Sequence, residues 1–275
     1  LGDLRSPNKI IYSIKHLNKI SSNFDLVHSQ YGSGCGFVTS KIKGCPKILS
    51  LRGSDWNAHK ATYKFDYWWA MIAKSITKIS IKNYDSIICV SQKMTNELKK
   101  KYPFKKFISM PSPIDLNIFK PIQKSIAREK LGFKNNKERW LLFTAANLKN
   151  PIKRYALAKE ATRLANVKLK NLKLRVAQNI PHAQIPTFIS ACDLVLCTSD
   201  NEGWPNSVKE GLACNLPFVS TDVSDLNDIA VNEPNCRICP PDAKIISENI
   251  CDVLLNPINN DLRKYVLPME INQSS

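Results

Sequence analysis

The stretch that most constrains the fold is residues 192–221, CDLVLCTSDNEGWPNSVKEGLACNLPFVST. Its apolar run Leu194–Cys197 has the length and composition of a buried parallel strand, and the polar residues 198–206 end that strand. Residues 207–214 predict a short helix, and residues 217–220 predict a second apolar strand. This order of strand, loop, helix and strand predicts an α/β fold whose loop lies at the carboxyl edge of a parallel sheet.

Both ends of the predicted helix carry residues that favour a helix boundary. Asn206 or Ser207 is expected to cap the first turn. Asn215 is expected to adopt the left-handed conformation at the other end, and Pro217 prevents continuation of the helix. Gly211 is small, so the helix can lie close to the preceding strand.

Two glutamates, Glu202 and Glu210, bracket this loop and the start of the helix. A helix that begins where a strand ends directs free N–H groups and a partial positive charge above the sheet, where a phosphate fits. From about one turn inside the helix, the Glu210 carboxylate can accept hydrogen bonds from a ribose diol. Glu202 can reach a second hydroxylated group. A random pair of glutamates is more often merely solvated, but the strand before and the small residues after favour a site here.

The string EGWPNSVKEGLACNLPFVST resembles the donor-site signature of the retaining glycosyltransferases of family 4, which have the GT-B fold. In that family two glutamates flank seven residues. The first glutamate lies at the donor sugar, the second at the nucleotide ribose, and the backbone between them holds the diphosphate. The resemblance therefore implies a catalytic Glu202 and a ribose-binding Glu210. It assigns donor binding to the residues between them, Gly203, Trp204, Pro205, Asn206, Ser207 and Val208.

The resemblance covers almost the whole chain and implies two Rossmann-like domains whose parallel sheets face a central cleft. The proline-containing segment 111–122 predicts a linker, which gives an acceptor-side domain over 1–120 and a donor-binding domain over 121–275. The first strand and glycine-rich loop of the family are not found in the first domain, nor is a long closing helix found at the carboxyl end. The chain is therefore expected to be a fragment with a truncated amino-terminal domain.

A second strand-to-helix turn is predicted over residues 147–153. A lysine in such a turn can stabilise a departing diphosphate, and the resemblance gives this catalytic role to Lys153. Relatives usually have an arginine where this chain has Asn147. Lys149 and Arg154 are the candidates to replace that arginine.

The segment 24–55 predicts a strand, a glycine-rich turn, a short helix and a strand that ends in Arg52-Gly53-Ser54-Asp55. This ending resembles a family pattern at the cleft, which implies that Arg52 and Asp55 contribute to donor binding, with the arginine facing a phosphate or sugar oxygen. The alternative is a surface arginine and a helix-capping aspartate. His28 also lies at a strand end, where a structural role is favoured over a catalytic one.

The net charge of +17 is concentrated in residues 1–122, where 20 Lys and Arg against 7 Asp and Glu give +13. A one-sided basic surface favours an anionic membrane or a nucleic acid as partner, although coding bias gives the same composition.

Residues 62–82, with Trp68 and Ile79 on their apolar side, predict a core-facing helix or, less commonly, an interfacial membrane helix. The lysine cluster 99–106 is solvated by default, with a phospholipid or nucleic-acid contact as its alternative.

The nine cysteines lie mostly in apolar contexts, which indicates buried thiols in a reducing compartment. No signal peptide opens the chain and no apolar run reaches the ~18 residues of a membrane span. A cytoplasmic protein is expected, with peripheral attachment at the inner face of the membrane. A structural role is favoured for the single pair Cys236 and Cys239. No metal is expected at the donor site either, since a lysine and a helix N-terminus can balance a diphosphate.

The resemblance implies a glycosyltransferase of the hexosyltransferase type that moves a sugar from a nucleotide-diphosphate sugar to a hydroxyl acceptor, and the resemblance alone supplies retention at the anomeric carbon. The donor is a co-substrate, and no cofactor is predicted. The acceptor is expected to be a saccharide or lipid-linked glycan of cell-envelope polysaccharide synthesis, for example of lipopolysaccharide. Two other classes stay open: a non-catalytic sugar-nucleotide-binding fragment and, favoured by charge alone, a nucleic-acid-binding protein.

Overall fold

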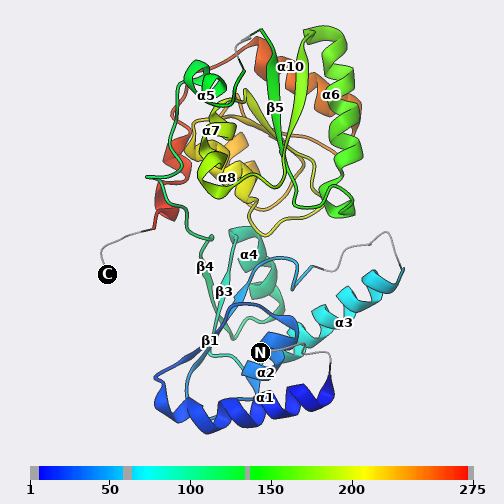
Figure 1. Ribbon diagram of the computed structural model, residues 1–275. Coiled ribbons are helices and arrows are strands. Elements are labelled where there is room, and N and C mark those ends of the chain that lie inside the picture. The colour runs from blue at the N-terminus through cyan, green and yellow to red at the C-terminus, as the bar shows by residue number, and fades with distance from the viewer. Residues whose placement is uncertain (1–5, 58–63, 134–136, 272–275) are drawn as a thin grey trace. The chain divides into compact units, whose positions relative to one another are not determined.

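A computed structural model describes residues 6–57, 64–133 and 137–271 of the chain. Contacts divide the chain into two compact units, each built around a parallel sheet (Figure 1). The first unit comprises Leu1–Pro111 with Asn201–Trp204, and the second comprises Ser112–Asp200 with Pro205–Ser275. The division after Pro111 falls inside the segment that the sequence predicts as the linker.

The sheet of the first unit has the strand order β1-β2-β3-β4, all parallel. Its strands are Val27–Ser29 (β1), Lys47–Leu51 (β2), Ser86–Cys89 (β3) and Lys106–Ser109 (β4). Its helices are Pro7–Ile20 (α1), Ser33–Ser40 (α2), Lys64–Ile81 (α3) and Gln92–Lys101 (α4), with a short 3-10 turn at Ser21–Asn23 (η1). Because parallel neighbours need a crossover, α2, α3 and α4 each connect consecutive strands.

Helix α3 differs from its prediction in the side that it buries. Trp68 and Ile79, predicted on the apolar side, are 59% and 57% exposed. The buried side instead includes Thr77, Ser80 and Ile81. The two hydroxyl groups can face the interior because each donates to a carbonyl one turn earlier in the helix, at 3.0 and 2.7 Å. The exposed face of α3 is therefore partly apolar.

The sheet of the second unit has the strand order β6-β5-β7-β8-β9, again all parallel. Its strands are Arg139–Thr144 (β5), Leu172–Ala177 (β6), Leu194–Cys197 (β7), Phe218–Ser220 (β8) and Arg237–Ile238 (β9). Its α-helices are Lys124–Lys130 (α5), Tyr155–Leu169 (α6), Ile185–Ser190 (α7), Asn206–Ala213 (α8), Leu226–Ala230 (α9) and Ala243–Leu255 (α10). Its 3-10 turns are Pro151–Lys153 (η2), His182–Gln184 (η3), Arg263–Tyr265 (η4) and Leu267–Met269 (η5).

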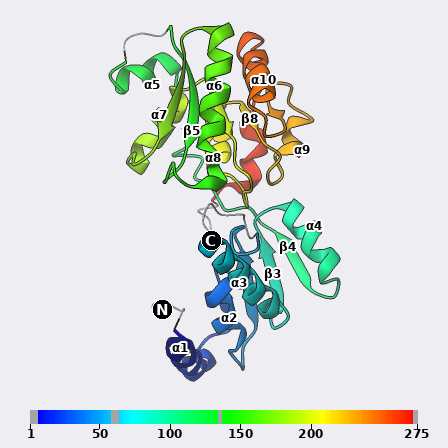
Figure 2. The same ribbon diagram turned by 90° about the vertical axis from the view of Figure 1, so that its right-hand side faces the viewer.

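Helices cover both faces of this second sheet. Helices α6 and α10 pack against each other (Figure 2), and their apolar side chains form one core with Leu141 and Leu194. The alternate strand residues Trp140 and Val195 face the opposite layer, since successive side chains of a strand point to opposite faces. There the buried guanidinium of Arg128 from α5 lies 4.6 Å from the Trp140 ring.

Among the described residues, no helix combines the length and the apolar character that crossing a membrane requires. All nine cysteines are free thiols, seven of them buried. Burial raises the pKa of Cys236 to about 12 and that of Cys239 to about 11. Thiols with such pKa values are poor nucleophiles and poor metal ligands, which agrees with a structural role for this pair.

Candidate functional site

The carboxyl ends of β5 and β7 form a topological switch point in the second unit. These strands are neighbours, but the chain continues from β5 to β6 on one side and from β7 to β8 on the other. Loops that leave a sheet in opposite directions open a crevice between them, and open α/β sheets bind their ligands there. The loop after β5 carries Lys153, and the loop after β7 leads into α8.

Hydrogen bonds join these two loops. The Thr198 hydroxyl donates to the carbonyl of Lys153 over 2.8 Å, and the backbone N–H of Asp200 donates to the carbonyl of Ile152 over 2.8 Å. The guanidinium of Arg154 pairs with the carboxylate of Asp200. The Arg154 side chain is thus held by an ion pair within the loops beside Lys153, a contact that the sequence did not predict.

Helix α8 begins at this edge without a side-chain cap. Its N-cap residue is the extended Pro205, which makes no side-chain cap hydrogen bond. The prediction that Asn206 or Ser207 caps the helix is therefore wrong, because both residues already lie inside it. The N–H groups at this end are left for water or an anionic ligand.

The other end of α8 follows the prediction. Asn215 has a φ of 61°, the left-handed conformation expected there. Gly211 permits close packing on β7, since a Cβ at this position would lie only 2.4 Å from Cγ2 of Val195.

Glu210 lies on α8, is half-buried and has an unusual protonation equilibrium. Burial raises the pKa of its carboxyl to about 7, against the opposing effect of the neighbouring Lys209 ammonium. In the part of the chain that the structure describes, its carboxylate has no hydrogen bond or ion pair. Its oxygens can therefore accept hydrogen bonds from a ligand.

In the first unit, Asp55 holds the turn that follows β2. Its carboxylate is 1% exposed and accepts hydrogen bonds from the backbone N–H groups of Gly32 at 2.9 Å, Arg52 at 3.0 Å and Gly53 at 2.9 Å. Burial raises its pKa, and these N–H groups act in the opposite direction. These contacts favour the structural alternative for Asp55. The Arg52 side chain is exposed and donates to Gln30.

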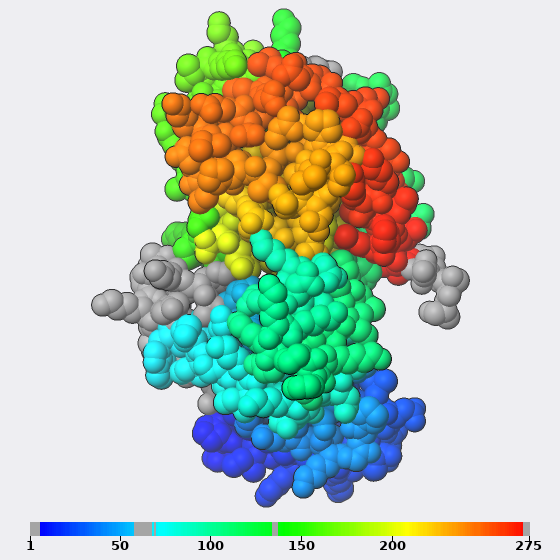
Figure 3. Space-filling model, turned by 180° about the vertical axis from the view of Figure 1, so that it is seen from behind, coloured from blue at the N-terminus to red at the C-terminus, as the bar shows by residue number. Residues whose placement is uncertain are grey.

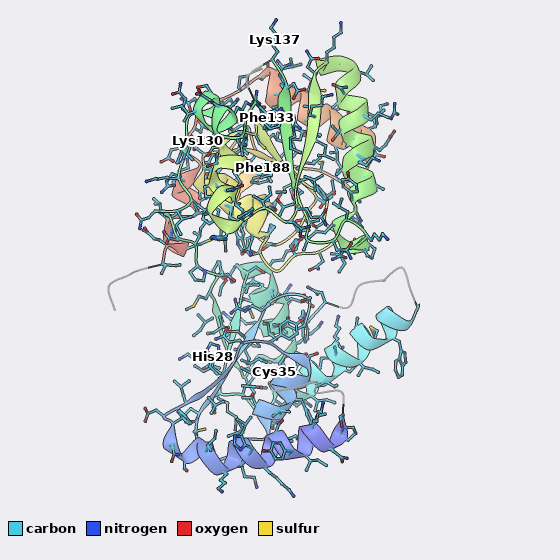
Figure 4. The ribbon with its side chains drawn as sticks, viewed as in Figure 1. His28, Cys35, Lys130, Phe133, Lys137 and Phe188 are labelled. Carbon is cyan, nitrogen blue, oxygen red and sulfur yellow. The ribbon has the colours of Figure 1, made fainter. Side chains whose placement is uncertain are left out.

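His28 lies on β1 of the first unit, where Figure 4 labels it. Its Nε2 lies 2.8 Å from the hydroxyl of Ser50, and its Nδ1 lies 3.0 Å from the amide nitrogen of Gln30. Burial and the positive charge of Arg52 both lower its pKa. These contacts favour the structural role expected from the sequence.

The four residues Asn201–Trp204 group with the first unit. Asn57 donates its side-chain N–H to Asn201 over 3.0 Å. A Cβ on Gly203 would lie 2.1 Å from the carbonyl oxygen of Arg52, so only glycine fits. Glu202 and Trp204 thus belong to the unit that contains Arg52 and Asp55. Lys153, Pro205, Asn206, Ser207, Val208 and Glu210 belong to the second unit.

Lys209 is a residue of this region that the sequence did not single out. A lysine beside a glutamate on a short helix is normally solvated, yet Lys209 is only 2% exposed. Its ammonium donates to the carbonyl of Ser112 over 2.6 Å.

Across the described residues, no cluster of three or more His, Cys, Asp or Glu side chains is placed to hold a metal ion.

Two family models match the chain. The model described as Glycosyltransferase Family 4 matches residues 2–118, and the model described as Glycosyl transferases group 1 matches residues 135–266. An uncharacterized glycosyltransferase of Methanocaldococcus jannaschii is 24% identical over 94% of this chain and 77% of its own length. TuaC of Bacillus subtilis, whose name links it to teichuronic acid biosynthesis, is 24% identical over 82% of this chain and 60% of its own length.

Solved structures show the same fold. A sucrose-phosphate synthase from Thermosynechococcus elongatus superposes with a TM-score of 0.75 at 15% identity, over 95% of this chain and 74% of its own. Anabaena HepE in complex with UDP and glucose superposes with a TM-score of 0.66 at 15% identity, over 94% of this chain and 77% of its own. At such identities the likeness establishes the fold, which is the predicted GT-B fold.

Proposed function

Because the chain belongs to the family 4 glycosyltransferases, we propose that it transfers a sugar from a nucleotide-diphosphate sugar to a hydroxyl acceptor with retention at the anomeric carbon. The observation that carries the proposal is the uncapped start of α8 at a switch point, with Lys153 in the adjoining loop and the half-buried Glu210 on the same helix. An anion-binding helix end next to an unpaired carboxylate suits a nucleoside diphosphate, which has phosphates and a ribose diol.

In the proposed reaction, the bond between the anomeric carbon and the diphosphate oxygen breaks, and a bond from the acceptor oxygen to the same carbon forms. The acceptor hydroxyl loses its proton, and the nucleoside diphosphate leaves. Lys153 and the N–H groups of α8 balance the charge that develops on the diphosphate. Glu210 accepts hydrogen bonds from the ribose, and Glu202 orients the donor sugar. The donor is a co-substrate, and the proposed chemistry uses no cofactor or metal.

The relatives suggest where to begin the search for substrates. HepE was solved with UDP and glucose, so UDP-sugars are the first donors to test. The name of TuaC supports a saccharide or lipid-linked acceptor of the cell envelope. A non-catalytic sugar-nucleotide-binding fragment, the alternative from the sequence, would bind the donor but release no product in a transfer assay with such acceptors.

The test of donor binding is calorimetry with UDP-sugars and GDP-sugars on the wild type and on Glu210→Ala. The loss expected from removing a charged hydrogen-bond acceptor is about 1 to 3 kcal/mol of binding free energy. Glu248→Ala, which removes an exposed glutamate from α10, is the matched control and should bind as the wild type does. Equal affinities for all three proteins would show that Glu210 does not recognise the ribose.

For the first unit we propose an anionic membrane surface as partner, with the enzyme peripheral to the inner face of the membrane. The contact surface is a basic face formed by the end of α3 and the end of α4 with the loop that follows it. Lys105 joins the two segments by donating to the carbonyls of Lys82 and Tyr84 over 2.7 and 2.8 Å. In Figure 3, the cyan part of the chain, which includes α3, lies beside the blue-green part, which includes α4.

This basic face combines positive charge with exposed apolar groups. Its exposed lysines are Lys78, Lys82, Lys100, Lys101 and Lys106. Phe104 is 100% exposed and Ile79 is 57% exposed. Of the nearby carboxylates, Glu97 pairs with Lys101 and Asp85 accepts from a backbone N–H. An exposed aliphatic side chain such as Ile79 cannot stack on a base but can enter a lipid interface, so its place among the lysines favours an anionic lipid surface over a nucleic acid.

A further inference from the structure

The linker at the start of the second unit is bonded to α8 at two points, directly at Lys209 and through Arg263 at Ala213. Near the first half of the helix, Lys209 donates to the carbonyl of Ser112. At its last residue, the Arg263 guanidinium donates to the carbonyl of Ala213 over 2.6 Å. The same guanidinium also donates to the linker carbonyls of Leu116 over 3.1 Å and Phe119 over 2.7 Å.

Arg263 comes from the carboxyl-terminal segment 262–271, which contacts the linker a second time. Ile114 donates its N–H to the carbonyl of Met269 over 2.8 Å, and Ile271 donates to the carbonyl of Ile114 over 3.1 Å. This pair of bonds makes a short parallel bridge. The linker therefore lies between α8 and the carboxyl-terminal segment and is bonded to both.

These contacts are more specific than general packing. Removing an ammonium group from water is costly unless it gains strong hydrogen bonds, and Lys209 gains one of 2.6 Å to a linker carbonyl. The carbonyl of Ala213 belongs to the last turn of α8, where carbonyls lack helical partners and attract cations. Arg263 satisfies that carbonyl and two of the linker with one rigid guanidinium.

We propose that Lys209 and Arg263 are positioning residues that couple the linker to the donor helix. They act through α8, which carries Glu210 at the residue next to Lys209, and they set where this carboxylate lies. The inference rests on the proposed donor-binding role of α8. It adds that the affinity for the donor depends on the hydrogen bonds that hold the linker in position. Loss of either residue should weaken donor binding without removing a group that touches the donor.

The experiment compares Lys209→Met and Arg263→Met with the wild type, using UDP and GDP as probes in calorimetry and UDP-sugars in the transfer assay. Both variants should raise the Kd of the nucleoside diphosphate and the KM of the donor about tenfold while changing kcat little, as expected when ground-state binding is lost. Arg263→Lys, which keeps a donor for the Ala213 carbonyl, should recover part of the loss. In a Glu210→Ala background, Lys209→Met should have little further effect.

Lys47→Met is the matched control, because the Lys47 ammonium also donates to a backbone carbonyl, that of Ile42 at 3.0 Å, but in the first unit. It should leave the Kd unchanged. Amide hydrogen exchange, measured without ligand, should be faster in residues 206–213 and 112–119 of both test variants and unchanged there in the control. Unchanged exchange in α8, or an unchanged Kd in both test variants, overturns the coupling. A wild type that binds no nucleoside diphosphate refutes the proposed function instead, and hydrogen exchange still decides the coupling.

Discussion

At Glu210, the proposed donor-binding role predicts a link between the stability of the protein and its affinity for the donor. Burial raises the pKa of its carboxyl in the folded protein to about 7, above the ordinary value of 4.5 for an unfolded glutamate. The protonated form is therefore favoured by folding, and this contribution is fully present below about pH 4.5 and lost as the pH rises through about 7. The carboxylate that we propose to accept hydrogen bonds from the ribose hydroxyls forms over the same range.

We therefore expect opposite pH trends for stability and for donor binding. The free energy of unfolding should fall between pH 5 and pH 8, and it should fall less in Glu210→Gln. The affinity of the wild type for a nucleoside diphosphate should rise over that range. The rise should be larger than in Glu210→Gln, where only the ionisation of the phosphate itself changes the affinity. Urea titrations and calorimetry at matched pH values give both quantities. A binding profile that is the same in the two proteins would contradict a role for the Glu210 carboxylate.

Glu233 shows the opposite dependence. Burial would raise the pKa of this carboxyl, but hydrogen bonds from Lys264, Asn260 and Tyr265 outweigh burial and lower it. The stability that Glu233 contributes is thus present above the ordinary carboxyl pKa and lost as the pH falls through the lowered one. Glu233→Gln should cost about 1 kcal/mol at pH 7, since it weakens these charge-assisted hydrogen bonds while the half-exposed Lys264 ammonium stays solvated, and less at acid pH. Urea unfolding of the two proteins at several pH values measures this difference.

The carboxyl end of α8 could be predicted from the sequence because local chemistry determines it. Asn215 follows a helix and precedes a proline at 217, so the left-handed conformation is its expected state. The long-range contacts of Asp55 and Lys209 could not be predicted. The Gly32 N–H that donates to Asp55, and the linker carbonyl that meets Lys209, are contributed by residues distant in sequence. Spacing along the chain contains no signal for such contacts.

At the scale of elements, the close packing of α8 on β7 requires a residue without a side chain at position 211. A methyl group on Gly211 would lie 2.4 Å from Cγ2 of Val195, a buried and β-branched residue with little rotamer freedom. Gly211→Ala should destabilise the protein by about 1 to 2 kcal/mol, because overpacking outweighs the better helix propensity of alanine. Val195→Ala should remove most of that penalty in the double variant. A thermal shift series on the four proteins measures the effect, and additive losses would show that the two side chains do not meet.

Strands and helices could be predicted in type and order because hydrophobic runs and turn residues alternate along the chain. The assignment of faces was harder for α3. Threonine and serine count as polar in a pattern, but hydroxyls that donate to their own helix can be buried, which leaves Trp68 and Ile79 exposed. The start of α8 was misplaced for a related reason: Asn206 and Ser207 are good caps, but the chain reaches the helix through an extended Pro205.

For the whole molecule, the uneven charge supports the proposal that the first unit binds an anionic membrane surface. Residues 1–122 have a net charge of +13 out of the total +17, and the basic face of α3 and α4 adds exposed apolar groups to that charge. Charge attracts the protein to an anionic bilayer, and apolar side chains that enter the interface hold it there. A surface that acted by charge alone would have no use for Phe104 in its exposed position.

Cosedimentation should therefore show binding to vesicles of phosphatidylcholine mixed with phosphatidylglycerol and little binding to phosphatidylcholine alone. Replacing Lys78 and Lys82 by glutamine should weaken the binding by about 2 kcal/mol, roughly thirtyfold, because each basic residue near an anionic surface contributes about 1 kcal/mol. Phe104→Ser should weaken binding that remains at high salt, whereas glutamine at Lys168 and Lys170 in the second unit should change little. If these variants instead lose binding to generic RNA while the wild type ignores the vesicles, the partner of this face is a nucleic acid and the membrane proposal is wrong.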